Sequence, residues 1–190
     1  MIPIRNRKKT LQVTVEEMRN FAFAYVDKYA PSKQQLKTYL LKKYLKTSVP
    51  NVKKQDVTNL IDIVLSDLEK NKFINDKFYS DSKAKSMIQR GNSINKIRSY
   101  LIGKGINDQF IRDTVDKIQD ENSDQDFFSA IKICKKKRIG PARIEDNRPL
   151  FYKKDISLLA RNGFDFETSK KVMDIDCLLY TSDAADDLVC

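Results

Sequence analysis

The stretch RSYLIGKGINDQFI, residues 98–111, ends one helical pattern and starts another within a few residues. Apolar residues recur at helical spacing up to Leu101, and two glycines then interrupt the pattern. Asn107 or Asp108 can cap a second helix, which continues through Ile111. Because glycine adopts the left-handed backbone that commonly ends a helix, the stretch predicts a short joint between two helices.

The same order of features recurs elsewhere in the chain. Gly105-Ile106 matches Gly163-Phe164, and the apolar spacing after the joint is repeated in an earlier segment. The equivalent positions are Tyr39-Leu40, Tyr100-Leu101 and Leu158-Leu159, and then Val57, Ile61 and Val64 against Ile111, Val115 and Ile118. Repetition at roughly 50 residues indicates stacked helical modules, each too small to bury its apolar stripe alone.

Capping signatures predict where several helices begin. Thr14 with Glu17, and Ser32 with Gln35, have the spacing of a capping box, and Ser93 precedes another apolar pattern. In the last third of the chain, a new group of helices is expected to open at Ser123. Its second helix carries Ile156, Leu158, Leu159 and Phe164, and its third begins with Val172 and Ile175.

These patterns predict an all-α protein of three tandem three-helix repeats that form an elongated, curved helical array. The predicted organisation is a basic N-terminal arm over 1–13, repeats over 14–74, 75–121 and 122–176 with the last helix cut short, and a non-native tail over 177–190.

The tail differs in composition from the rest of the chain. Residues 177–190, CLLYTSDAADDLVC, contain no lysine or arginine, and CLLYTSDAADD resembles translated sequencing-adapter DNA. A natural acidic C-terminal segment is the alternative. Without the three aspartates of this segment, the chain has 36 basic and 23 acidic residues, a formal net charge of +13.

Composition argues against several classes of protein. The 190 residues include no histidine, which removes the commonest general base and metal ligand, and the three cysteines have no metal-ligand spacing. No apolar run reaches the roughly 18 residues of a spanning helix. The expectation is a cytoplasmic, monomeric, non-catalytic protein with no cofactor and no metal site.

The excess of basic residues is the main functional feature. Clustered positive charge attracts phosphate backbones and acidic protein grooves, although lysine-rich helices also occur simply as solvated faces. Sequence-specific DNA reading, for which Asn95 and Arg98 are the nearest base contacts, and base stacking by aromatic residues are less favoured alternatives. The candidate filament- or DNA-binding residues are Lys42, Lys43, Arg90, Lys96, Arg98, Lys104, Arg112, Lys135, Lys136, Lys137, Arg138 and Arg143.

Several motifs, in this order and spacing, resemble the RecX family of bacterial regulators of the RecA recombinase, in particular its alphaproteobacterial members. The similarity covers about residues 18–176. The motifs are YVDKYAPS (25–32), LKTYLLKK (36–43), FINDKFY (73–79), RG (90–91), KGI (104–106), KKRIGP (136–141) and LARNGF (159–164).

The resemblance implies three tandem three-helix repeats that lie in the groove of the RecA filament on DNA and limit recombination, ATP hydrolysis and coprotease activity. Its implied partners are the RecA nucleoprotein filament and, directly, single- or double-stranded DNA. A general DNA-binding helical protein without a recombinase partner is the alternative. Two departures from the family are the long segment 46–55 and Asn162, where an arginine is usual.

Overall fold

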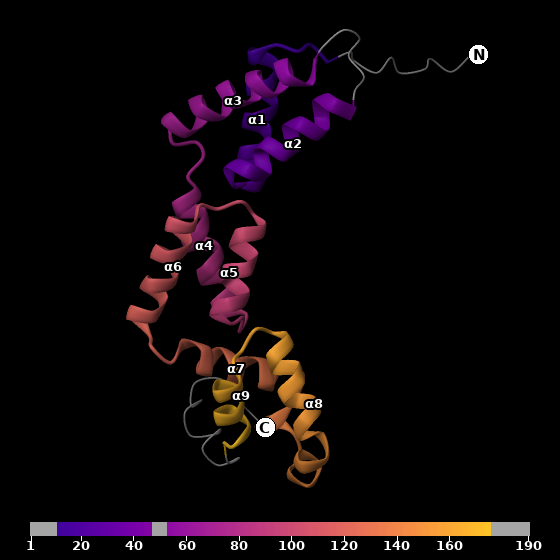
Figure 1. Ribbon diagram of the computed structural model, residues 1–190, viewed down its shortest axis with the longest axis vertical. Helices are drawn as coiled ribbons and strands as arrows, with labels where there is room; N and C mark the ends of the chain where they lie inside the picture. The colour runs from indigo at the N-terminus through magenta and orange to yellow at the C-terminus, as the bar shows by residue number, and fades with distance from the viewer. Residues whose placement is uncertain (1–10, 47–52, 176–190) are drawn as a thin grey trace, which may run out of the picture. The chain divides into compact units, whose positions relative to one another are not determined.

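The computed structural model describes residues 11–46 and 53–175, and in these ranges the chain is helical throughout, without a β-strand (Figure 1). The predicted all-α fold class is confirmed. Most of the predicted arm, part of the segment 46–55 and the predicted tail 177–190 lie outside the described residues. The helices are α1 (Val15–Tyr29), α2 (Lys33–Lys46), α3 (Lys54–Lys70), α4 (Asp76–Gln89), α5 (Ile94–Gly103), α6 (Asp108–Glu121), α7 (Gln125–Lys137), α8 (Arg148–Arg161) and α9 (Phe166–Met173), with 3-10 turns η1 (Gly140–Ala142) and η2 (Glu145–Asn147) before α8.

The described residues form two compact units. One comprises residues 11–79, with the gap at 47–52, together with 104–106, and the other comprises 80–103 and 107–175. The boundary between them falls inside α4. Three helices lie within each of the ranges predicted for the repeats, but the boundaries of the repeats themselves stay a prediction.

In the first unit, α1, α2 and α3 pack against one another around an apolar core. Thr14 caps α1 as predicted, because its hydroxyl accepts a hydrogen bond from the Glu17 amide at 3.3 Å. The reciprocal half of that capping box is not formed, since Oε2 of Glu17 is buried without a hydrogen-bond partner. The core side chains are Met18, Ala22, Leu36, Leu40, Tyr44, Val57, Ile61, Val64, Leu65, Leu68 and Ile74.

The N-terminus of α2 is held by a cluster of polar contacts that we call the first joint. Ser32 and Gln35 form both halves of the predicted capping box, at 3.1 and 3.2 Å. The buried Ser32 hydroxyl also donates to the Lys104 carbonyl at 2.8 Å, and the Lys33 amide donates to the Asp76 carboxylate at 2.8 Å. The first turn of α2 is thereby tied to two segments far along the chain.

The second unit repeats this arrangement at the N-terminus of α5, in a second joint. The buried Ser93 hydroxyl accepts from the Lys96 amide at 3.1 Å and donates to the Asn162 carbonyl at 2.8 Å. The Ile94 amide donates to the Asp126 carboxylate at 2.8 Å. Both joints therefore combine a capping serine, a distant carbonyl and an aspartate from the first turn of the second helix further along the chain, α4 for the first joint and α7 for the second.

Both joints also require the glycine that follows the accepting carbonyl. Gly105 and Gly163 have φ angles of +71° and +89°, which residues with a Cβ rarely adopt. A Cβ on Gly105 would lie 2.6 Å from Cβ of Gln34, and one on Gly163 would lie 2.5 Å from Oγ of Ser93. The glycine turn in the stretch 98–111 thus recurs because another helix terminus packs directly on it.

Burial raises the pKa of the aspartate in each joint. For Asp76, the raising effect of burial exceeds the opposite effect of the Lys33 amide, and Glu69 adds repulsion. For Asp126, burial likewise exceeds the effect of the Ile94 amide, with repulsion from Asp165. The two carboxylates therefore exchange solvation for a backbone hydrogen bond in the same way.

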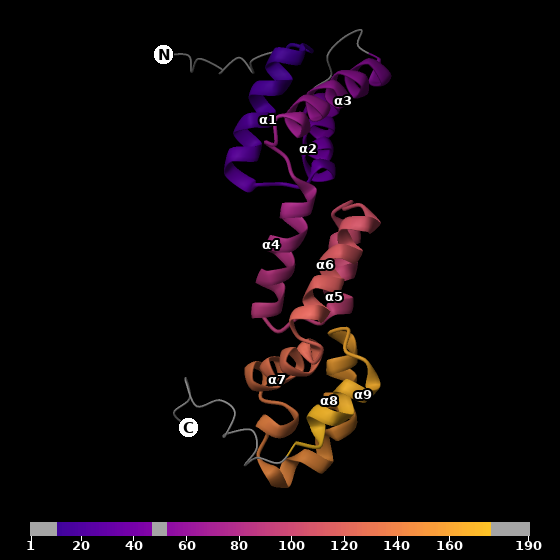
Figure 2. The same cartoon turned by 90° about the vertical axis from the view of Figure 1, so that its left-hand side faces the viewer.

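The helices α7, α8 and α9 pack together around an apolar core within the second unit (Figure 2). Cys134 lies fully buried in this core, and burial raises the pKa of its thiol to about 12. The predicted third helix is displaced from its expected position. It begins at Phe166, well before Val172, because the Asp165 carboxylate accepts from the Thr168 amide at 2.6 Å and caps it there.

Candidate interaction surface

The helix α5 presents a positively charged outer surface. It buries Ile94, Ile97 and Leu101 and leaves Lys96 and Arg98 exposed. Arg90 is exposed in the turn that precedes α5. The whole segment 82–107 contains no acidic residue, and its basic residues are Lys83, Lys85, Arg90, Lys96, Arg98 and Lys104.

The second joint fixes the orientation of this surface. Asn95 donates through its amide to the Gly163 carbonyl at 3.2 Å, and the Lys96 ammonium donates to the Asn162 side-chain oxygen at 3.1 Å. Arg98 lies further along α5 and has no ion-pair partner among the described residues. Because the Asn95 amide is engaged within the fold, the pair Asn95 and Arg98 is poorly suited to reading base edges.

In the first unit, the basic residues of α2 divide into two groups. Lys33 and Lys37 pair with Glu69 and Asp62 of α3, each at 2.6 Å. Lys42 is exposed and forms no ion pair within the described ranges, and the Lys43 ammonium lies 3.7 Å from the centre of the Phe21 ring. Lys104, whose carbonyl is bound in the first joint, has a half-buried side chain. The charges of Lys33 and Lys37 are thus neutralised by α3, whereas Lys42 has no ion-pair partner in the described ranges.

The basic run 135–138 lies at the end of α7. Lys136, Lys137 and Arg138 are exposed and Lys135 is half-buried. Positive charge at a helix C-terminus is favourable with the helix dipole. This run therefore stabilises α7 whether or not it also binds a partner.

Arg143 occupies a different environment from the other candidates. Its guanidinium forms a bidentate ion pair with the Asp155 carboxylate, with hydrogen bonds of 3.0 Å to Oδ2 and 2.9 Å to Oδ1. It also lies 4.3 Å from the Phe151 ring centre. The Asp155 side chain is only 2% exposed and also accepts from the Gly140 amide at 3.0 Å. Arg143 thus neutralises a buried carboxylate, which gives it a structural role in the fold.

Arg112 is exposed on α6, outside the acid-free segment 82–107. Its helix carries more acidic than basic residues, as does α3. The charges are thus segregated by helix, with α2 and α5 basic and α3 and α6 acidic. Arg112 therefore lies on a helix whose surface is mainly negative.

Several exposed basic residues were missed by the sequence analysis. Lys153, Lys154 and Arg161 are exposed on α8, and Lys85 is exposed on α4. Lys85 lies within the acid-free segment 82–107, which would have identified it. Arg148 is also basic, but its guanidinium donates to the Pro141 and Arg143 carbonyls.

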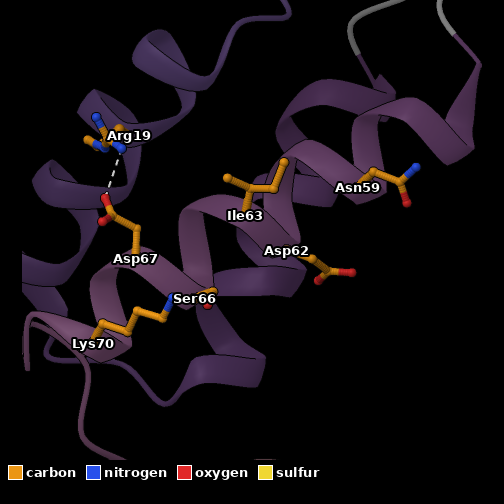
Figure 3. A pocket seen from close by; sticks show the side chains of 7 residues that line it. All are labelled: Arg19, Asn59, Asp62, Ile63, Ser66, Asp67 and Lys70. Atoms are coloured by element: carbon orange, nitrogen blue, oxygen red, sulfur yellow. Dashed lines mark ion pairs between the residues drawn. The ribbon is translucent and has the colours of Figure 1, made fainter.

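An open hollow of about 620 Å³ lies along α1 and α3 (Figure 3). Its wall contains the ion pair between Arg19 and Asp67, at 2.8 Å, and the exposed side chain of Ile63. Asp62, also on the wall, pairs with Lys37. Both acidic side chains of the wall are paired with basic ones on an open surface, which does not resemble a catalytic pocket.

The described ranges contain neither a candidate metal site nor a candidate membrane span. No group of acidic, cysteine or histidine side chains in them has the arrangement of a metal site. None of their helices combines the length and the apolar character needed to cross a bilayer.

Comparison with known proteins identifies related chains. No family model matches the sequence. The regulatory protein RecX of Myxococcus xanthus (strain DK1622) is 30% identical over 177 residues, which cover 90% of this chain and 91% of that protein. A crystal structure of a regulatory protein RecX superposes with a TM-score of 0.61 at 18% identity, covering 85% of this chain and 74% of the other.

The two comparisons support the same conclusion from different sides. The structural likeness shows a shared fold, and the sequence identity extends over nearly the full length of both chains. With the all-helical architecture, they establish that this chain belongs to the RecX family.

Proposed function

We propose that this protein is a non-catalytic regulator of the RecA recombinase that binds the RecA–DNA filament and limits recombination, ATP hydrolysis and coprotease activity. Membership of the RecX family supports the partner. The observation that carries the proposal is the positive surface of α5, where Lys96 and Arg98 are exposed in a segment without acidic residues.

Electrostatics explains how such a surface would act. Positive charge facing a polyanionic filament accelerates encounter and makes binding sensitive to salt. Repeats that contact successive subunits of a filament act at a high effective concentration, so that several weak contacts give tight binding. Inhibition then follows from occupying the groove of the filament, and no chemical step by this chain is required.

The test is ATP hydrolysis by RecA on single-stranded DNA, with this protein added well below the RecA concentration. We expect inhibition at a small fraction of that concentration. Inhibition only when the DNA itself is saturated would instead favour the second candidate, a general DNA-binding protein that competes for the lattice.

Charge reversal tests the surface. The double variant Arg98→Glu with Lys104→Glu should bind the filament more weakly and show a smaller salt dependence, while circular dichroism confirms that the helices are intact. The matched control is Lys70→Glu with Lys117→Glu, which makes the same change in net charge on the acidic helices α3 and α6. Equal weakening by both double variants would refute a specific role for the α5 region.

A further inference from the structure

Three tyrosine rings lie in contact where α1 meets α2, within the first unit: two of them are stacked, and the third, that of Tyr29, is tilted by 46° against Tyr25. The Tyr25 and Tyr39 rings are nearly parallel, with centres 4.1 Å apart and an interplanar angle of 13°. Tyr29 continues the series, with its ring centre 4.8 Å from that of Tyr25. We call Tyr25, Tyr29 and Tyr39 the tyrosine ladder.

The ladder has a packed end and an open end. Tyr25 and Tyr39 are half-buried and pack against the core of the first unit. Tyr29, at the end of α1, is 54% exposed. The ladder therefore presents an exposed aromatic ring, Tyr29, in contact with the Tyr25 ring, which is itself stacked on Tyr39.

The open end is held rigidly. The helix α1 ends at Tyr29, and the following Ala30 adopts a left-handed conformation while its amide donates to the Val26 carbonyl at 2.9 Å. Pro31 and Ser32 are then buried, and Ser32 is bound in the first joint. The backbone that carries Tyr29 is thus held by local contacts, so that binding a flat partner orders only the side chain.

The surroundings of the ladder are positively charged. Residues 28–55 contain no acidic residue, and their basic residues are Lys28, Lys33, Lys37, Lys42, Lys43, Lys46, Lys53 and Lys54. Lys33 and Lys37 are already paired with Glu69 and Asp62 of α3, so the exposed basic residues that the site uses are Lys28 and Lys42. Lys28 is exposed, with its ammonium 5.2 Å from the Tyr29 ring centre, and Lys42 is exposed one turn beyond Tyr39 on α2. Asp27 is exposed on α1, two positions from both Tyr25 and Tyr29, so helical spacing turns it away from their stripe.

We propose that the tyrosine ladder is a base-stacking site for single-stranded nucleic acid. An unpaired base stacks on the Tyr29 ring, and Lys28 and Lys42 contact the phosphates on either side. Aromatic rings next to lysines bind single strands in this manner because every base has a flat face, whereas bases in a duplex are already stacked on one another. The site goes beyond filament regulation and needs no RecA.

The experiment compares an oligothymidylate with an abasic oligomer of the same length, which keeps the phosphates but lacks the bases. Binding is measured by fluorescence anisotropy of a labelled strand without RecA. Wild type should prefer the oligothymidylate, and Tyr29→Ala should reduce that affinity by about 5-fold or more, since stacking contributes roughly 1–3 kcal/mol per base. Tyr29→Phe should retain the preference.

Phe78→Ala is the matched control, because Phe78 is 70% exposed in the same unit but lies outside the ladder. Replacing Lys28 and Lys42 by glutamine should weaken binding to both oligomers and lower the salt slope by about one ion per lysine. Equal affinity of wild type for the two oligomers, or unchanged oligothymidylate binding by a folded Tyr29→Ala protein, overturns the proposal. Since RecA is not present in this assay, either result bears only on the stacking site. The proposed filament regulation is tested separately by the ATP-hydrolysis experiment.

Discussion

Replacement of Gly163 by alanine tests whether the second joint holds the fold together. The backbone there has φ +89°, and the left-handed region costs a residue with a Cβ about 1–2 kcal/mol. The new Cβ would also lie 2.5 Å from Oγ of Ser93, which must move and lose its 2.8 Å hydrogen bond to the Asn162 carbonyl. With about 1 kcal/mol for that bond, the expected loss of unfolding free energy is about 2–3 kcal/mol.

Urea denaturation followed by far-UV circular dichroism measures this loss, and Gly103→Ala is the matched control. Gly103 is helical with nothing within 4 Å of an added Cβ, so alanine there should stabilise by up to about 1 kcal/mol. Ser93→Ala combined with Gly163→Ala should cost less than the sum of the two single changes, because both disrupt the same bond. If the two glycine variants differ by less than about 0.5 kcal/mol, the joint is not a structural requirement.

Three further changes have defined outcomes. Asp126→Ala should cost about 1–3 kcal/mol in urea by leaving the Ile94 amide unpaired, whereas Asp126→Asn keeps an acceptor and should cost less. Because burial raises the pKa of Asp126, this carboxylate is protonated at a higher pH in the folded state than in the unfolded chain. The unfolding free energy of wild type should therefore rise relative to that of Asp126→Asn as the pH falls through the raised pKa toward about 4. A difference between the two proteins that does not change with pH would contradict this. Arg143→Ala should cost about 3–5 kcal/mol by leaving the buried Asp155 unpaired, and a loss below 1 kcal/mol would mean that the pair is dispensable. Cys134, with its pKa raised to about 12, should resist alkylation at neutral pH in the native protein and react after unfolding, as measured by peptide mass spectrometry.

The local parts of the fold were predictable from sequence because their causes are local. Ser32 and Ser93 precede apolar helical patterns, and each does begin a helix there. Gly105 and Gly163 follow helical patterns, and both have the positive φ that favours glycine. Each of these features depends on residues within one or two turns.

The contacts that complete the joints were not predictable in this way. Asp126 reads as an acidic residue in the first turn of a helix, which the helix dipole favours in any case. Nothing near it in the sequence indicates that it accepts from Ile94, 32 residues away. Similarly, Arg143 reads as part of a basic surface, and only the fold brings the buried Asp155 against it.

The second joint connects the stability of the fold to the proposed function, since it acts on the helix that carries the basic surface. Its contacts hold Ser93, Ile94, Asn95 and Lys96, which lie two to five residues before Arg98. A charge contributes to specific binding only if its direction is fixed relative to the partner, because a freely moving charge gives attraction without register. The joint would supply that fixed direction. Gly163→Ala changes no charge. It should therefore lower the affinity for the filament while leaving the salt dependence of binding nearly unchanged.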